Sequence, residues 1–205
     1  APYTVEVDGL RACADRARRI DAPLCIHVAE TPEEESFTRR LEGPLVDLLK
    51  GAEVWEETMR PSGVGPVELC GTSGLLGPQT VLAHANYVSD ADVAMIARSG
   101  SSVAYCPRTH AAFGHRPHRF RDMLRAGVNV CVGTDSLASN PSLSVLDELR
   151  FLRRNHGDVP AEEIISMGTL RGASALGLAH VTGSITVGKS ADLVVIPLRT
   201  ADRGW

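Results

Sequence analysis

Four short runs of apolar residues recur along the chain, and each has the length of a buried β-strand. They show little alternation between apolar and polar positions, which is typical of strands covered on both faces of a parallel sheet. The runs occupy residues 23–28, 80–84, 102–106 and 129–134. We therefore predict four strands of one parallel sheet.

Amphipathic helical patterns separate these runs. Residues 7–19 carry apolar positions at helical spacing and end in a basic turn, which suits the helix dipole. Residues 31–41 begin with Thr31 as the predicted N-cap, and Glu34 would complete a capping box. The other acidic residues of that first turn are expected to be solvated, as is Glu34. Further helices are predicted over residues 89–100, 140–155 and 168–178, the second of them capped by Asn140.

This alternation of strands and helices predicts an α/β fold. The strand starts at residues 80, 102 and 129 are close to the roughly 30-residue repeat of a (β/α)₈ barrel. Four strands are too few to close such a barrel, so we expect a partial one. After the last helix, residues 183–198 predict a turn and a β-strand that belongs to another structural unit.

Composition and charge argue against several classes of protein. The chain has 205 residues, a formal net charge of −4 and no basic run, which argues against a nucleic-acid partner. It contains no apolar stretch long enough for a membrane span and no signal-peptide pattern. Five scattered cysteines favour a reducing compartment, and we expect a cytoplasmic protein. Cys25, Cys106 and Cys131 lie in the strand-like runs and are expected to be buried.

Polar residues with metal-ligand chemistry follow three of the four predicted strands. His27, with Glu30 after it, closes the first; His84 closes the second; and Asp135 follows the fourth. In a (β/α)₈ barrel the carboxyl ends of the strands meet at one mouth, so these side chains would converge. Histidine nitrogen and aspartate oxygen are ligands for zinc or iron(II). One such histidine is more often structural, whereas three strand ends together favour a site.

The chain resembles the amidohydrolase superfamily in several segments that come in that family's order. They include "IHVAETPEE", "LAHANYVSDADV", "VAYCPRTH" and "RAGVNVCVGTDSLASN". The H-x-x-E pattern at His27 and Glu30 and the "GTDS" at Asp135 are the most specific. The nearest branch is the cytosine deaminase and chlorohydrolase-like one, which includes adenosine, methylthioadenosine and S-adenosylhomocysteine deaminases.

The resemblance implies a (β/α)₈ barrel with a small β-sandwich. Residues 1–180 would be the part of the barrel that holds its strands five to eight. Residues 181–205 would be a piece of the sandwich. The implied cofactor is one divalent metal, Zn²⁺ in the first place and Fe²⁺ as the alternative.

The same resemblance assigns roles to the strand-end residues. His27 and Asp135 would bind the metal, Glu30 would be the proton shuttle, and His84 would orient the attacking hydroxide or the substrate. The implied reaction is hydrolytic deamination of an aminated purine, a nucleoside or a related heterocycle. Chloride release on the same scaffold is the alternative, and the presence of Glu30 favours deamination.

Other residues near the predicted mouth are weaker candidates. His110 and Ser136 are expected to contact a small-molecule substrate. His115 and His118 have a spacing that could bind metal, but no carboxylate or cysteine accompanies them, so the simpler expectation is a solvated loop.

The chain also departs from the family pattern. None of its seven histidines forms the H-x-H pair of the first barrel strand. We therefore expect it to be the C-terminal half to two-thirds of an enzyme, inactive and prone to aggregation without the missing N-terminal half. A homodimer is a further expectation. The alternative of a different class is a non-catalytic fragment.

Overall fold

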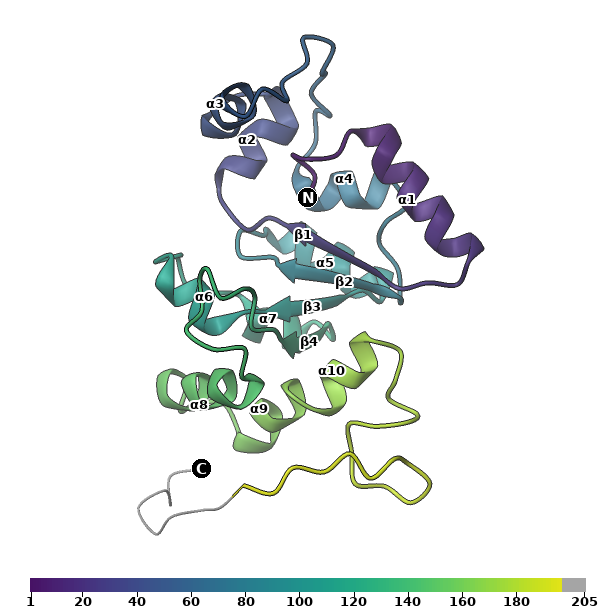
Figure 1. Ribbon diagram of the computed structural model, residues 1–205, viewed down its shortest axis with the longest axis vertical. Helices are drawn as coiled ribbons and strands as arrows, with labels where there is room; N and C mark the ends of the chain where they lie inside the picture. The colour runs from purple at the N-terminus through teal and green to yellow at the C-terminus, as the bar shows by residue number, and fades with distance from the viewer. Residues whose placement is uncertain (197–205) are drawn as a thin grey trace.

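Four parallel strands form one sheet in the computed structural model, which describes residues 1–196 (Figure 1). They are paired in sequence order, and their bounds are β1 (Leu24–Val28), β2 (Thr80–His84), β3 (Ser102–Tyr105) and β4 (Asn129–Val132). Val28 lies opposite His84, and Tyr105 lies opposite Val132. All four strands therefore end at one edge, at the arrowheads in Figure 1. The predicted α/β fold with four parallel strands is confirmed.

The helices lie between and around these strands. They are α1 (Val7–Arg19), α2 (Glu33–Arg40), α3 (Pro44–Gly51), α4 (Pro66–Thr72), α5 (Asp90–Ser99), α6 (Pro107–Ala112), α7 (Phe120–Arg125), α8 (Val145–Asn155), α9 (Ala161–Met167) and α10 (Leu170–Ala175). α1 has the predicted bounds. The helix predicted over residues 140–155 begins only at Val145, because the Ser144 side chain accepts the Asp147 N–H and caps it there.

The main hydrophobic core lies between the helices and one face of the sheet. The strand residues on this face are Val28, Leu82, Val103, Tyr105 and Val130. They pack against buried side chains of α1, α4, α5, α7, α8 and α9, including Leu10, Val67, Ile96, Met123, Leu152 and Ile164. Burial of this apolar face fixes which side chains of each strand point away from it.

The opposite face of the sheet is only partly covered by the described residues. Val81, Cys131 and Ala175 of α10 form a small buried cluster there. On β1, however, Cys25 and His27 are exposed. The prediction that Cys25 is buried is therefore wrong, because a strand run without strong alternation does not reveal which of its faces lacks a covering element.

The strand predicted over residues 183–198 is not formed within its described part, residues 183–196. Val187, Val194 and Val195 are at least 84% exposed there. A strand needs a neighbour for its N–H and C=O groups, and among the described residues no strand lies beside this segment. Residues 197 and 198 lie outside the described part, and the assignment of residues 181–205 to a sandwich stays a prediction.

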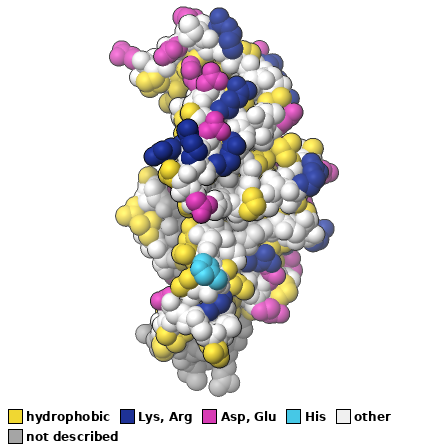
Figure 2. Space-filling view, turned by 90° about the vertical axis from the view of Figure 1, so that its right-hand side faces the viewer, with side chains coloured by type: hydrophobic (Ala, Val, Ile, Leu, Met, Phe, Trp, Pro, Cys, Tyr) yellow, Lys and Arg dark blue, Asp and Glu magenta, His cyan; other side chains and the backbone are white. Residues whose placement is uncertain are grey.

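The surface on the right of Figure 1 carries charges of both signs. Figure 2 shows lysine and arginine side chains interspersed with acidic and hydrophobic ones on this face. Within residues 1–196, no helix is both long and apolar enough to cross a membrane.

Replacing Leu82 should test the core on the helix-covered face. Leu82 is fully buried in β2, so Leu82→Ala should lower the free energy of unfolding by about 2–5 kcal/mol, through lost burial and a cavity. Leu48→Ala is the matched control, because Leu48 is 57% exposed and should change stability by less than about 0.5 kcal/mol. Chemical denaturation measures both. Equal effects would contradict this description of the core.

Candidate metal centre

Three potential metal ligands converge at the carboxyl edge of the sheet. His27 lies on β1, His84 ends β2, and Asp135 follows β4. One ligand atom of each lies within 4.8 Å of the others, and in residues 1–196 no other group of three such residues does so. Two atoms bound to one zinc ion at about 2.1 Å lie at most about 4.2 Å apart, so a small side-chain rotation would bring all three into range. Two imidazole nitrogens and a carboxylate oxygen suit zinc or iron(II).

His84 reaches this group because its backbone leaves strand geometry. By alternation along β2 it belongs to the core-facing side of Leu82, yet its ring centroid is 5.1 Å from that of the exposed His27. Its φ of 72° lies in the left-handed region, as do those of Ala29 (51°) and Asp135 (57°). Such a conformation costs a non-glycine residue roughly 1–2 kcal/mol. Several of them at the ends of neighbouring strands are typical of a functional site.

Glu30 lies beside the three ligands. Its Oε1 is 3.7 Å from Nε2 of His84, and its side chain is 21% exposed. Burial raises the pKa of this carboxyl, the charge of Asp135 raises it further, and His27 opposes the shift. Glu30 is therefore a carboxyl group that takes up a proton more readily than an exposed one.

Glu34 fixes the loop that carries Glu30. Its side chain is 1% exposed, and its carboxylate accepts the backbone N–H groups of Ala29 at 2.7 Å, Glu30 at 2.7 Å and Thr31 at 3.3 Å. The prediction of a solvated Glu34 is wrong, although its bond to the Thr31 N–H is one half of the predicted capping box. Burial raises the pKa of this carboxyl, and the three N–H groups oppose that shift. Because Glu34 lies in a run of three acidic residues at the start of α2, the sequence did not distinguish it from its neighbours.

A second buried carboxylate, Glu148 of α8, links the start of α6 to the loop after β4. It accepts the backbone N–H of Arg108 and the side-chain amide of Asn140. Asn140 also donates to the carbonyl oxygen of Thr134, next to Asp135. The prediction of Asn140 as a helix cap is therefore wrong, because its side chain is used to shape the metal-ligand loop.

Ser139 contacts Asp135 directly. Its hydroxyl donates to Oδ2 of Asp135 at 3.1 Å and lies 3.0 Å from the hydroxyl of Thr109 in α6. Sequence reasoning chose Ser136 for this neighbourhood, but that residue is exposed and its hydroxyl accepts the Ala138 N–H. The signal that could have found Ser139 is its position four residues after Asp135 in a short loop.

Two histidines that follow β3 are buried: His110 in α6 and His118 in the loop between α6 and α7. His118 is 8% exposed and lies against the backbone of His84, so the expectation of a solvated loop is wrong for it. His110 is also 8% exposed, and within residues 1–196 its Nε2 has no hydrogen-bond partner. Burial lowers the pKa of His118 to about 3, and burial together with the charge of His115 lowers that of His110 to about 4. Both rings are therefore neutral at pH 7.

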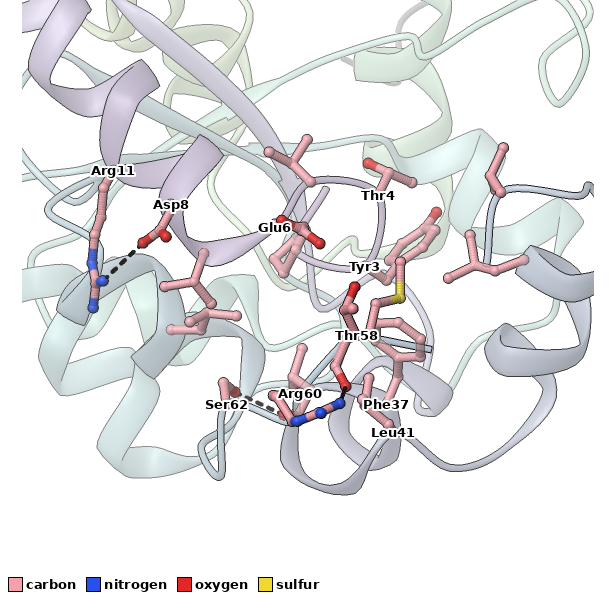
Figure 3. A pocket seen from close by; sticks show the side chains of 18 residues that line it. Tyr3, Thr4, Glu6, Asp8, Arg11, Phe37, Leu41, Thr58, Arg60 and Ser62 are labelled. Atoms are coloured by element: carbon pink, nitrogen blue, oxygen red, sulfur yellow. Dashed lines mark hydrogen bonds and ion pairs between the residues drawn. The ribbon is translucent and has the colours of Figure 1, made fainter. Parts of the chain in front are cut away.

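A cavity of about 360 Å³ lies apart from these ligands, between the N-terminal segment and α2 and α3 (Figure 3). Its lining includes the apolar or aromatic side chains of Tyr3, Phe37 and Leu41 and the polar ones of Thr58 and Arg60. None of the four strand-end residues lines it. We therefore assign the candidate site from the convergence of His27, His84 and Asp135 and not from this cavity.

Comparison with known proteins gives a family for nearly the whole chain. A sequence profile of the Amidohydrolase family matches residues 1–202. The chain is 32% identical to a 5'-deoxyadenosine deaminase of Methanoregula boonei, and 33% identical to a 5-methylthioadenosine/S-adenosylhomocysteine deaminase of Pyrococcus abyssi. Each match covers 98% of this chain but only 42% and 44% of the relative. The chain thus spans less than half the length of these relatives.

A solved structure supports the same fold. An adenosine deaminase from Xanthomonas campestris with bound zinc superposes with a TM-score of 0.75 at 27% identity. The match covers 93% of this chain and 40% of that one. The four parallel strands and their helices are therefore arranged as in part of that enzyme.

Acidification should weaken the metal-free fold through its buried histidines. The unfolded chain binds protons below the ordinary histidine pKa of 6.5, whereas His84 and His110 do so only near pH 4. Their contribution to the free energy of unfolding is therefore present above pH 6.5 and is lost as the pH falls towards 4.

His110→Gln isolates one part of this effect. Buried carboxyls with raised pKa values, such as Glu30 and Glu34, oppose the trend in the same range, so only the difference between the two proteins is informative. Chemical denaturation at pH 4.5 and 7 should show a smaller loss for the variant than for the wild type. Parallel losses would contradict the burial of His110 as a neutral ring.

Proposed function

Because the chain belongs to the amidohydrolase family, we propose that it carries metal-binding and proton-transfer groups of a hydrolytic deaminase. The observation that carries this proposal is the convergence of His27, His84 and Asp135, with Glu30 beside them. Four groups from three strand ends are the set that metal-assisted hydrolysis needs: ligands, a proton acceptor and a proton carrier.

His27 and Asp135 are the proposed ligands of one divalent metal, with Zn²⁺ in the first place and Fe²⁺ as the alternative. The donor set supports this assignment, as does the zinc bound to the Xanthomonas campestris relative. When bound, such a metal supplies hydroxide near neutral pH by lowering the pKa of water to about 7. His84 lies within reach of the same ion, and we assign to it the orientation of the hydroxide or of the substrate.

The side chains divide the proton transfers among them. Asp135 accepts the proton of the attacking water, and Glu30 delivers it to a ring nitrogen of the substrate. Burial and His27 lower the pKa of His84 to about 4, so at pH 7 its ring is a neutral hydrogen-bond donor. It can stabilise the oxygen that attacks the ring carbon without giving up its proton. The remaining hydroxyl proton then passes through Asp135 to the amino group, so that the C–N bond breaks, ammonia leaves and the ring carbon becomes a carbonyl.

The proposed substrate is an aminated purine nucleoside or a related heterocycle. Relatives named for 5'-deoxyadenosine and for 5-methylthioadenosine support this class. His110, whose buried Nε2 has no partner, and Ser136 on the loop after Asp135 are proposed to contact the substrate. Glu30 favours ammonia over chloride as the leaving group, because an amine must be protonated before it departs and chloride need not be.

We further propose that β1 to β4 are part of a longer (β/α)₈ barrel. The partly uncovered sheet face and the exposed His27 support this, since further strands would cover both. The relatives, more than twice as long as the matched region, have room for such strands. Additional ligands would then come from outside residues 1–205, and dimer formation stays a prediction.

Two substitutions separate metal binding from proton transfer. In the complete barrel, Glu30→Gln should keep zinc affinity and reduce deamination by roughly 10²–10⁴-fold, since it removes the proton carrier alone. Asp135→Asn should weaken zinc binding about tenfold or more and reduce activity as well. Zinc titration and ammonia release from 5'-deoxyadenosine measure the two properties, with zinc removal by a chelator abolishing turnover.

Glu35→Gln is the matched control, because Glu35 is an exposed carboxylate of the same loop-to-helix region and pairs with Arg39. It should leave both properties unchanged. Equal loss of zinc in the Glu30 and Asp135 variants would remove the assignment of Glu30 as proton carrier. A wild-type protein that binds no zinc would remove the proposed metal centre.

A further inference from the structure

We propose that His118 is a positioning residue that holds His84 in the site by a hydrogen bond to its backbone. Nε2 of His118 lies 2.8 Å from the carbonyl oxygen of His84. Thirty-four residues separate the two in sequence, and sequence reasoning gave His118 no part in the site.

The backbone of His84 needs such a partner because it departs from the strand at that point. The next residue, Ala85, also has a positive φ of 50°, and its N–H donates to the carbonyl of Val28 on β1. The carbonyl of His84 accepts the ring N–H of His118. This pair of bonds holds both sides of the peptide that turns the His84 ring towards His27.

The hydrogen bond also determines the tautomer of His118. A carbonyl oxygen only accepts, so Nε2 must carry the proton and Nδ1 must be the unprotonated nitrogen. Among the described residues, this Nδ1 is buried and has no hydrogen-bond partner. A buried acceptor without a partner costs free energy. The ring of His118 thus makes its bond to His84 through Nε2 while Nδ1 remains without a partner among the described residues.

Neighbouring aromatic rings fix His118 in place. Its ring stacks on Tyr105 of β3 with centroids 4.0 Å apart and an interplanar angle of 17°. Tyr105 in turn stacks on Phe120 of α7 at 5.4 Å and 19°. The three rings are 1–8% exposed. His118 is therefore held against β3 by stacking on Tyr105, and its hydrogen bond in turn holds the end of β2.

Two substitutions of equal length test the donor. Gln and Met have the same chain length, but only Gln offers an N–H near the position of Nε2. His118→Met should weaken zinc binding about 10–100-fold, because it would displace His84, one of the three groups within reach of the ion. His118→Gln should restore most of that affinity. Competition with a chromophoric chelator measures both, with thermal unfolding recorded to confirm that each variant is folded.

Phe120→Leu is the control for packing, because it disturbs the same ring stack but removes no bond to His84. It should lower the unfolding temperature and leave zinc affinity close to that of the wild type. A loss of affinity as large as that of His118→Met, or wild-type affinity in His118→Met, would overturn the proposal.

This inference depends on the proposed function at one point, because one of its tests measures zinc affinity. In the metal-free wild type, nitrogen-15 NMR should find the His118 proton on Nε2. Proton–proton NMR contacts should show that the rings of His27 and His84 lie against each other. That contact should be lost in His118→Met and kept in His118→Gln. A wild type without zinc affinity would remove the metal centre alone, whereas a proton on Nδ1 only would overturn the role of His118 whatever the metal does.

Discussion

The parallel pairing of β1 to β4 in sequence order is the constraint on which the candidate site depends. It brings the ends of segments about 110 residues apart in sequence, at His27 and Asp135, to one edge of a sheet. The helix-covered core in turn fixes the register, because a slip by one residue would turn the apolar face of every strand away from the helices. The ligand geometry is thus a by-product of core burial, refined only in the last residue or two of each strand.

That refinement is carried by buried carboxylates of α2 and α8 that bind the neighbouring loops. Glu34 accepts three backbone N–H groups of the loop that carries Glu30. Glu148 links the start of α6 to the loop that follows Asp135. Burying a carboxylate is costly, and burial raises the pKa of both. The backbone N–H groups and the Asn140 amide offset this cost and hold the left-handed residues in place. Loops held in this way keep the site side chains in fixed positions without a bound ligand.

The sequence was sufficient for the four strands of the sheet, for α1 and for the three converging side chains, because apolar runs and strand-end polar residues are local signals. It was insufficient where the decisive partner is distant in sequence. The bond from His118 to His84 and the bond from Asn140 to Glu148 depend on how loops pack, which no periodicity encodes. The exposure of Cys25 could not be predicted either, since an apolar strand reads alike whether one face or both are covered. The residue roles taken from family resemblance stay predictions.

The segment from Ile185 to Ile196 has a consequence for how molecules of this chain meet one another. Its valines project into solvent, and among residues 1–196 no strand pairs with its backbone. Such a segment is a template for pairing with an identical copy, and the frequency of that encounter grows with the square of concentration. We therefore expect dilution, or a competing strand supplied in excess, to reduce self-association of this chain, whatever the stability of its core.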